Sequence, residues 1–376
     1  MNTVLVTGTN GKTSTVLTIA ALLHASGRPV VAWSSLGRVV GGAGPDPTAR
    51  PLLPSSADIA HAIAVGRRAV GPAGALVVEL SVHHLAAGAA ELLEPDVVVL
   101  TSIGADHLED LGGVAGYRRT KLRAAGAVAP GGVLVAPVSL RGLLQAATQA
   151  GTQVRLVGPG GTTRTGRPNV TGTTTSSMME LPDVGRVDIV TPGPSTALHR
   201  NRRLVVACAD QLGTELRTAL DVAANHPPPA GRLHVEDLGD GRTAVVDAAH
   251  NPSALGHALA DARRITRGRL VAVLGAGGGR DRWKRRAMGR VADAAADVVI
   301  VTDDNPRREA PADIRSAILL GAPTALEVVG RDRAIRAAID LLGPGDTMCV
   351  LGCGPDRWPN EAGLATHDLE VVRAHA

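Results

Sequence analysis

The stretch VLVTGTNGKTS, residues 4–14, decides the fold of this chain. A run of apolar residues leads straight into a glycine-rich loop, and the loop leads into a helical pattern of apolar residues at positions 16–23. Glycines let backbone N–H groups turn toward an anion, and the first turn of a helix offers unpaired N–H groups and a positive dipole end. The pattern G-x-x-G-K-T therefore predicts a phosphate-binding loop, with an ordinary strand-to-helix turn as the alternative.

The loop offers both backbone and side-chain groups to a nucleotide. Lys12 can add a cation against the outer phosphates, and the Thr13 hydroxyl is placed to bind Mg²⁺. The loop is shorter than the G-x-x-x-x-G-K-[ST] motif, because Val6 stands five positions before Gly11. The predicted nucleotide-binding residues are Gly8, Thr9, Asn10, Gly11, Lys12, Thr13 and Ser14.

The composition is that of a folded protein with room for two or three domains: 376 residues, of which 44% are hydrophobic. The net charge is +4, but basic and acidic residues are interspersed, and aromatic residues make up only 1%. We therefore expect no nucleic-acid partner, because such binding needs a concentrated basic stripe or stacking side chains. Anionic small substrates remain compatible with the charge.

The chain carries no sign of secretion or membrane insertion. It begins with a strand rather than a charged leader, and no run of about 18 or more apolar residues occurs. Its three cysteines, Cys208, Cys349 and Cys353, do not make a four-cysteine metal site. We therefore expect a cytoplasmic protein with no membrane partner.

Short apolar runs alternate with longer helical stretches along the whole chain, which predicts an α/β protein with mostly parallel sheets covered by helices on both faces. Residues 158–194 are rich in Thr, Gly, Ser and Pro, which suggests short strands and turns at an edge of the first domain. Three prolines in residues 225–231 mark a linker, so the predicted domains are 1–229 and 230–376. The predicted strands are 76–80, 97–101, 132–136, 243–246, 270–274, 298–302 and 347–351.

Polar residues follow several of these strands, where open α/β sheets gather ligands. Glu79 closes one buried strand, although an acid there could also cap a helix. Asp106 and His107 follow the next strand and suit metal binding or proton transfer, with a surface loop histidine as the alternative. Lys121, taken by itself, is typical of a solvated basic helix face. Beyond the linker, Asp247, His250 and Asn251 stand at another strand end, with a turn stopped by Pro252.

In this order the motifs resemble those of the Mur ligase superfamily, and among its members they are most similar to those that add the third residue of the peptidoglycan stem peptide. Residues 7–14 resemble T-G-T-N-G-K-T-[ST], residues 79–81 resemble the magnesium-binding E-[LV]-S, and residues 103–108 resemble I-G-x-D-H-L. Residues 117–121 resemble Y-x-x-x-K, whose lysine is usually carbamylated, so the resemblance reverses the solvated interpretation of Lys121.

The resemblance continues over essentially the whole chain. Asn201 falls on the second asparagine of an adenine-contacting motif, while the first falls on Leu198 and is lost. Residues 231–232 resemble the start of G-R-x-E, residues 247–252 resemble D-x-A-H-[NT]-P, and residues 275–288 resemble G-C-G-G-D-R-D-K-G-K-R-P-L-M. Residues 303–307 match D-D-N-P-R, the amino-acid pocket. Gly352 and Asp356 lie where G-K-G-H-E is expected.

The resemblance implies a P-loop ATPase domain followed by a Rossmann-like C-terminal domain, and an enzyme that uses ATP and Mg²⁺ to join a carboxylate to an amino acid through an acyl phosphate, releasing ADP and phosphate. It assigns the chemistry to Lys12, Glu79, His107, Lys121, Arg232, Asp247 and His250. Metal binding falls to Thr13, Glu79, His107 and carbamylated Lys121. Further nucleotide contacts fall to Asn201, Arg232, Asp247 and Asn251, and substrate contacts to Asp304, Asn305, Arg307, Gly352 and Asp356.

Departures from the family pattern concern the substrate. Third-residue ligases carry an N-terminal UDP-sugar domain, whereas this chain starts at the phosphate loop, and residues 45–54 lack the T-T-P motif. We therefore expect a substrate other than a UDP-muramyl peptide, with specialised metabolism as one setting. Two alternatives remain: an acyl-phosphate-forming subunit that takes ammonia from a glutaminase partner, weakened by the absence of a four-cysteine zinc insertion, and a non-catalytic nucleotide-binding module. A monomer is compatible with the sequence.

Overall fold

The computed structural model describes residues 1–46, 52, 54–145, 147–148, 152–158, 174–181, 185–192, 195–229, 231–354, 358–359 and 365–375. These residues form two compact units. The first contains the described residues of Met1–Thr165, Thr174–Pro192 and Ala197–Pro227. The second contains those of Pro228–Ala376, together with Ser195 and Thr196.

A seven-stranded sheet with the order β3-β2-β4-β1-β5-β6-β7 forms the centre of the first unit. Neighbouring strands run parallel, except that β3 is antiparallel to β2. The carboxyl ends of β1, β4 and β5 therefore share one edge, and the residues that follow these strands meet there. The strands are β1 (Asn2–Thr7), β2 (Val30–Ser34), β3 (Gly37–Val40), β4 (Ala75–Glu79), β5 (Val97–Leu100), β6 (Val133–Pro137) and β7 (Gln153–Val157).

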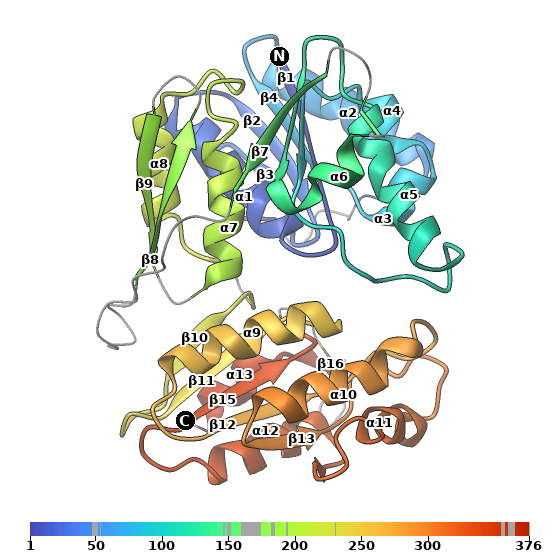
Figure 1. Ribbon diagram of the computed structural model, residues 1–376, viewed down its shortest axis with the longest axis vertical. Helices are drawn as coiled ribbons and strands as arrows, with labels where there is room; N and C mark the ends of the chain where they lie inside the picture. The colour runs from blue at the N-terminus through green and yellow to red at the C-terminus, as the bar shows by residue number, and fades with distance from the viewer. Residues whose placement is uncertain are drawn as a thin grey trace. The chain divides into compact units, whose positions relative to one another are not determined.

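Helices cover both faces of this sheet, as Figure 1 shows for α1, α7 and α8 on one side and α2, α4 and α5 on the other. Because side chains alternate along a strand, Val4 and Val6 enter the core beneath α1, whereas Leu5 enters the core beneath α2. The helices are α1 (Lys12–Ala25), α2 (Ser56–Val70), α3 (Val82–Ala86), α4 (Ala89–Leu93), α5 (Gly113–Gly126), α6 (Arg141–Leu144), α7 (Thr196–Val206) and α8 (Leu216–Asn225), with a 3-10 turn, η1 (Val138–Leu140). Strands β8 (Thr174–Leu181) and β9 (Gly185–Pro192) form a separate antiparallel pair against α8.

The second unit repeats this plan with a six-stranded sheet of order β10-β11-β15-β12-β13-β14, in which only β10 is antiparallel to its neighbour. Helices α9, α10 and α11 pack on one face, and α12 and α13 pack on the other. The strands are β10 (His234–Asp237), β11 (Thr243–Asp247), β12 (Leu270–Leu274), β13 (Val298–Val301), β14 (Leu326–Glu327) and β15 (Thr347–Leu351), and β16 (Trp358–Pro359) pairs with β17 (Ala365–Thr366). The helices are α9 (Pro252–Ile265), α10 (Trp283–Ala295), α11 (Pro311–Leu319), α12 (Arg331–Asp340) and α13 (Asp368–Ala374).

The predicted α/β class with mostly parallel sheets is confirmed, and each predicted strand appears within one residue at either end. Strand β10, with the sequence HVED, lacks an apolar run and was not predicted, because its pairing with β11 rather than its composition makes it a strand. One local prediction was wrong: Pro252 begins α9 at a position where its missing N–H costs nothing, instead of stopping a turn. No helix in the described part of the chain is long and apolar enough to cross a membrane.

Candidate active site

The predicted phosphate loop connects β1 to α1 and depends on two close approaches of its backbone. Gly8 has φ +149°, and a Cβ there would lie 2.0 Å from the Thr101 hydroxyl oxygen. Gly11 has φ +89°, and a Cβ there would lie 2.5 Å from Oδ1 of Asn201. Both separations are far below van der Waals contact, and Gly8 also lies close to the Ser102 backbone, so a Cβ at either position would force its neighbours or the loop to shift.

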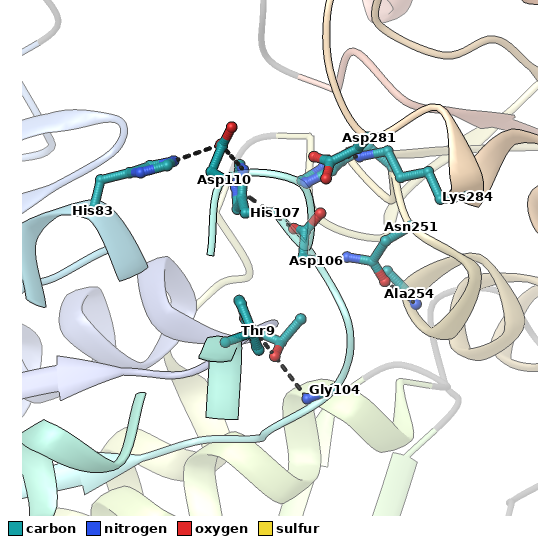
Figure 2. A network of polar contacts seen from close by, with 12 residues as sticks. Thr9, His83, Gly104, Asp106, His107, Asp110, Asn251, Ala254, Asp281 and Lys284 are labelled. Carbon is teal, nitrogen blue, oxygen red and sulfur yellow. Dashed lines mark hydrogen bonds and ion pairs between the residues drawn. The ribbon is translucent and has the colours of Figure 1, made fainter. Parts of the chain in front are cut away.

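Residues at the end of β5 hold the loop in place. The Thr9 N–H donates to the Ser102 carbonyl at 2.9 Å, and the Thr101 hydroxyl donates to the Asn10 carbonyl at 2.6 Å. The Gly104 N–H donates to Thr9 Oγ1 at 2.7 Å, as Figure 2 shows. Thr9 Oγ1 also lies 2.8 Å from the hydroxyl of Tyr117, the aromatic residue of α5. The loop is therefore fixed by hydrogen bonds from two neighbouring elements and is preorganised for a ligand.

Thr13 and Glu79 meet at the carboxyl edge of the sheet. The Thr13 hydroxyl donates to Oε2 of Glu79 at 2.9 Å, and the Ser35 N–H donates to the same oxygen at 3.0 Å. The Ser35 hydroxyl lies 2.8 Å from that of Thr13. Three oxygen donors thus converge beside the phosphate loop, and an all-oxygen donor set fits Mg²⁺. Glu79 does not cap either neighbouring helix, because Ser81 caps α3 and Gly11 occupies the N-cap position of α1.

Lys121 is buried on α5, with 1% of its surface exposed, so its interpretation as a solvated face is wrong. Its ammonium donates to the Thr7 hydroxyl at 3.1 Å. Burial, and then the nearby charge of Lys12, hold the pKa of Lys121 well below its ordinary value, while Glu79 and Asp106 oppose that shift. Lys12 itself donates to the Thr9 carbonyl at 3.0 Å. The site thus brings two lysines and two carboxylates into one electrostatic neighbourhood.

His107 lies between two carboxylates in the loop that follows β5. Its Nε2 is 3.8 Å from Oδ2 of buried Asp106, and its Nδ1 is 3.9 Å from Oδ2 of exposed Asp110. Its backbone has φ +49°, a conformation that costs about 1 kcal/mol or more for a residue other than glycine. The ring is half-buried rather than a free surface group, with 20% of the side chain exposed.

In the second unit, Arg232 and Asp247 lie together. Oδ2 of Asp247 accepts from the Leu233 N–H at 2.7 Å, and the Ala248 N–H donates to the Gly231 carbonyl at 3.0 Å, so the turn that carries Arg232 is fixed to the end of β11. Burial raises the pKa of Asp247 above its ordinary value, and the charge of Arg232 partly offsets this.

His250 and Asn251 follow Asp247. Nδ1 of His250 lies 2.9 Å from the Ala248 carbonyl, which can only accept, so Nδ1 carries the proton and Nε2 of this exposed ring is an acceptor when the imidazole is neutral. Oδ1 of Asn251 accepts from the Ala254 N–H at 3.0 Å and caps α9, a contact that is visible in Figure 2. Asn251 is therefore already engaged in local structure.

The predicted amino-acid pocket forms one cluster of loops in the second unit. Asn305 and Arg307 are exposed, and Arg307 has φ +54°. The Asn305 carbonyl accepts from the Gly278 N–H at 2.8 Å, which joins this loop to the glycine loop 275–279. Gly352 packs against Asp304, because a Cβ there would lie 2.8 Å from Oδ2 of the aspartate. Asp356 lies outside the described residues.

Cys353 stands next to Gly352 and is a packed thiol rather than a reactive one. Its side chain is 5% exposed, and burial raises its pKa well above the ordinary value.

Several residues of the first-unit site were not predicted from the sequence. Ser35, Thr101, Ser102 and Tyr117 all contact the loop or its partners, as described above. Ser35 directly follows β2, and Thr101 and Ser102 directly follow β5. Their position after an apolar run could have marked them as candidate site residues. Tyr117 begins the Y-x-x-x-K motif, but its contact with Thr9 could not be predicted, because the two residues are 108 positions apart in sequence.

A glycine-rich loop that ends in Lys-Thr and joins a strand to a helix at the carboxyl edge of a mostly parallel sheet is the arrangement found in P-loop nucleotide-binding proteins. The Mur ligase middle domain family matches residues 6–201, and the Mur ligase glutamate ligase domain family matches residues 231–354. The chain belongs to the Mur ligase family, whose members are ATP-dependent enzymes that form amide bonds and use ATP and Mg²⁺.

Individual relatives agree with this assignment. The chain is 34% identical to a UDP-N-acetylmuramoyl-L-alanyl-D-glutamate–2,6-diaminopimelate ligase of Caulobacter vibrioides, over 98% of the chain and 77% of the relative. It is 32% identical to the ligase of the same name from Corynebacterium efficiens, over 98% and 72% of the two chains.

Solved structures show the same fold. A UDP-N-acetylmuramoyl-L-alanyl-D-glutamate–2,6-diaminopimelate ligase superposes with a TM-score of 0.64 and 23% identity, over 100% of this chain and 78% of the other. The folylpolyglutamate synthase of Mycobacterium tuberculosis, complexed with ADP and AMPPCP, superposes with a TM-score of 0.71 and 20% identity, over 94% and 88%. At this level of identity the likeness concerns the fold alone.

We predict that Gly11→Ala weakens nucleotide binding. The new methyl would lie 2.5 Å from Asn201, on a backbone with φ +89°. This strain, about 1–3 kcal/mol, favours a relaxed loop that no longer has the binding conformation. We therefore expect the affinity for the nucleotide to fall by roughly tenfold or more. Titration calorimetry with a non-hydrolysable ATP analogue and Mg²⁺ measures the change. Gly142→Ala is the matched control, because a Cβ there has nothing within 4 Å. An unchanged affinity of Gly11→Ala would contradict the assignment of this loop.

Proposed function

We propose that this chain joins a small carboxylic acid to an amino acid through an acyl phosphate. A carboxylate oxygen of the acid attacks the γ-phosphorus of ATP, and the bond to the bridging oxygen breaks to release ADP. The amine then attacks the acyl carbon, the bond from that carbon to the phosphate oxygen breaks, and the nitrogen loses a proton, which gives the amide and free phosphate. The observation that carries the proposal is the Thr13–Glu79 contact of 2.9 Å directly behind the phosphate loop of a Mur ligase family member.

The site residues have distinct roles in this proposal. Lys12 and the loop amides stabilise negative charge on the transferring phosphoryl group. Thr13 and Glu79 would hold Mg²⁺, which neutralises phosphate charge when bound. His107 and Lys121 would hold a second magnesium ion. Asn201, which lies against Gly11, supports the nucleotide at the start of α1.

The second unit supplies candidates for the remaining contacts. Arg232, Asp247, His250 and Asn251 are proposed to act on the nucleotide and the reacting groups. Arg307, exposed on its loop, is suited to bind the α-carboxylate of the amino acid in a bidentate manner. Asp304, Asn305 and Gly352 would complete that pocket.

We propose further that Lys121 is carbamylated. Its amine is fully buried and its pKa is lowered, so the neutral form, which reacts with CO₂, is accessible. The reaction forms an N–C bond, releases a proton and converts a buried cation into an anion. The new negative charge would then face Lys12 favourably, whereas a buried ammonium costs several kcal/mol of desolvation.

The acid and amine are proposed to differ from those in the names of the relatives. This part depends on two motif departures: the sequence GCGPD at residues 352–356 in place of G-K-G-H-E, and the absence of T-T-P in residues 45–54. The first departure alters the neighbourhood of the amino-acid pocket, and the second alters the nucleotide-sugar side.

ADP release tests the ligase proposal. A panel that pairs small carboxylic acids with amino acids should give ADP only when both partners are present, and Lys12→Ala and Glu79→Gln should lower the rate by roughly 100-fold or more, the scale of losing one preorganised charge-stabilising group. Arg67→Ala, an exposed change on α2, should leave the rate unchanged.

The same panel separates the other outcomes. Turnover with UDP-N-acetylmuramoyl-L-alanyl-D-glutamate and 2,6-diaminopimelate would refute the different substrate but keep the ligase. Turnover with ammonia alone would favour an amidating subunit. Nucleotide binding without ADP release for any pair would refute the ligase proposal.

Carbamylation predicts that activity depends on bicarbonate. Protein equilibrated with ¹³C-bicarbonate should show a carbamate carbon signal by NMR that is absent from Lys121→Met. Depleting CO₂ should lower the rate of the wild-type protein, and bicarbonate should restore it. The signal should weaken as pH falls, because the protonated amine does not react with CO₂. A missing carbamate signal together with a rate independent of bicarbonate would contradict this role.

A further inference from the structure

A cluster of two histidines and one aspartate lies beside the loop after β5. His83 is on α3, whereas His107 and Asp110 are in the loop that leads into α5. Helices α3 and α5 pack together, which brings the loop to α3. Figure 2 shows the three side chains converging, with Asp110 between the two rings.

The donor atoms of this cluster have the spacing of metal ligands. Nε2 of His83 lies 3.7 Å from Oδ2 of Asp110, and Nδ1 of His107 lies 3.9 Å from the same oxygen. One ligand atom from each residue lies within 4.8 Å of the others. Ligands about 2.0–2.1 Å from a tetrahedral metal lie roughly 3.3 Å apart. Each histidine–aspartate separation would therefore shorten by about half an ångström on coordination, and the separation of the two ring nitrogens by at most about 1.5 Å.

The chemistry of the donors selects the kind of ion. Two imidazoles and one carboxylate favour first-row transition metals, whereas Mg²⁺ favours oxygen donors such as those of Thr13 and Glu79. A three-ligand set leaves positions for water, and the partial exposure of His83 (35%) and Asp110 (44%) gives an ion a route from solvent.

Asp106 lies near the second ring nitrogen of His107, at an ion-pair distance rather than a hydrogen-bond distance. A metal-binding histidine commonly donates its second ring N–H to a carboxylate, which fixes the orientation of the ring. Nε2 of His107 lies 3.8 Å from Oδ2 of Asp106, while Nδ1 of the same ring faces Asp110. The edge-to-face arrangement of the two imidazoles, with centroids 4.8 Å apart at 71°, leaves both rings pointing toward Asp110.

We propose that His83, His107 and Asp110 bind a first-row transition-metal dication, with Zn²⁺ as the expected ion. This site has a nitrogen-rich donor set and shares His107 with the second magnesium ion proposed above. A neutral imidazole offers one lone pair to a metal, so the ring holds only one of the two ions at a time, and the transition-metal ion would occupy it in the protein without nucleotide. The bound ion would cross-link α3 to the loop that carries Asp106 and His107, and would thereby hold that loop in place.

The test uses the full-length, metal-free protein without nucleotide or substrate, so its outcome does not depend on the ligase proposal. Co²⁺ is the spectroscopic probe, and its visible absorption reports coordination by nitrogen; Zn²⁺ then displaces it in a competition titration. We expect one equivalent to bind, and His83→Gln and Asp110→Asn each to weaken binding by at least about tenfold, the scale of losing even an outer ligand partner.

The controls separate coordination from folding. His61→Gln removes an exposed histidine of α2 and should bind Co²⁺ and Zn²⁺ as the wild type does. Circular dichroism checks that each variant is folded. If His83→Gln does not fold, Asp110→Asn still tests the proposal, because Asp110 is exposed. Failure to bind one equivalent, or binding that survives in a folded Asp110→Asn variant, would overturn the proposal.

Discussion

Two close approaches of glycine backbone organise the candidate active site. Gly8 lies against Thr101 at the end of β5, and Gly11 lies against Asn201 in α7, so a Cβ at either glycine would force its neighbours or the loop to shift. These contacts join the phosphate loop to segments about 90 and 190 residues further along the chain. The strand order places the relevant strand ends at one edge, and the close approaches then fix where the loop amides lie.

Charge is the second organising feature of this edge. Lys121 is placed beneath the loop with its ammonium on Thr7, near Lys12, Glu79 and Asp106. A buried cation in that position carries a large desolvation free energy unless it is neutralised, modified or paired. Glu79 instead accepts from Thr13 and Ser35. The arrangement therefore suits a site in which metal ions and phosphates complete the charge balance, as expected for phosphoryl transfer.

Much of the fold could be predicted from the sequence because the central strands are continuous apolar runs with helices on both faces. Glu79 and Thr13 were also predictable, since one ends a strand and the other opens a helix. The burial of Lys121 was not apparent from its basic neighbours Arg118, Arg119 and Arg123; only the family resemblance indicated it. The contact between Thr9 and Tyr117 depends on how α5 packs against the sheet, which the sequence does not show. Asp110 becomes a candidate metal ligand only in the folded protein, where α3 places His83 beside it.

The central claim is that the loop amides of residues 8–14 bind the phosphates of ATP. Hydrogen exchange followed by mass spectrometry, with and without a non-hydrolysable ATP analogue and Mg²⁺, measures this directly. The account predicts strong protection of peptides that cover residues 8–14, accompanied by weaker protection of the β5 end that holds the loop. Saturating nucleotide that protects other segments and leaves residues 8–14 exchanging as in the free protein would contradict it.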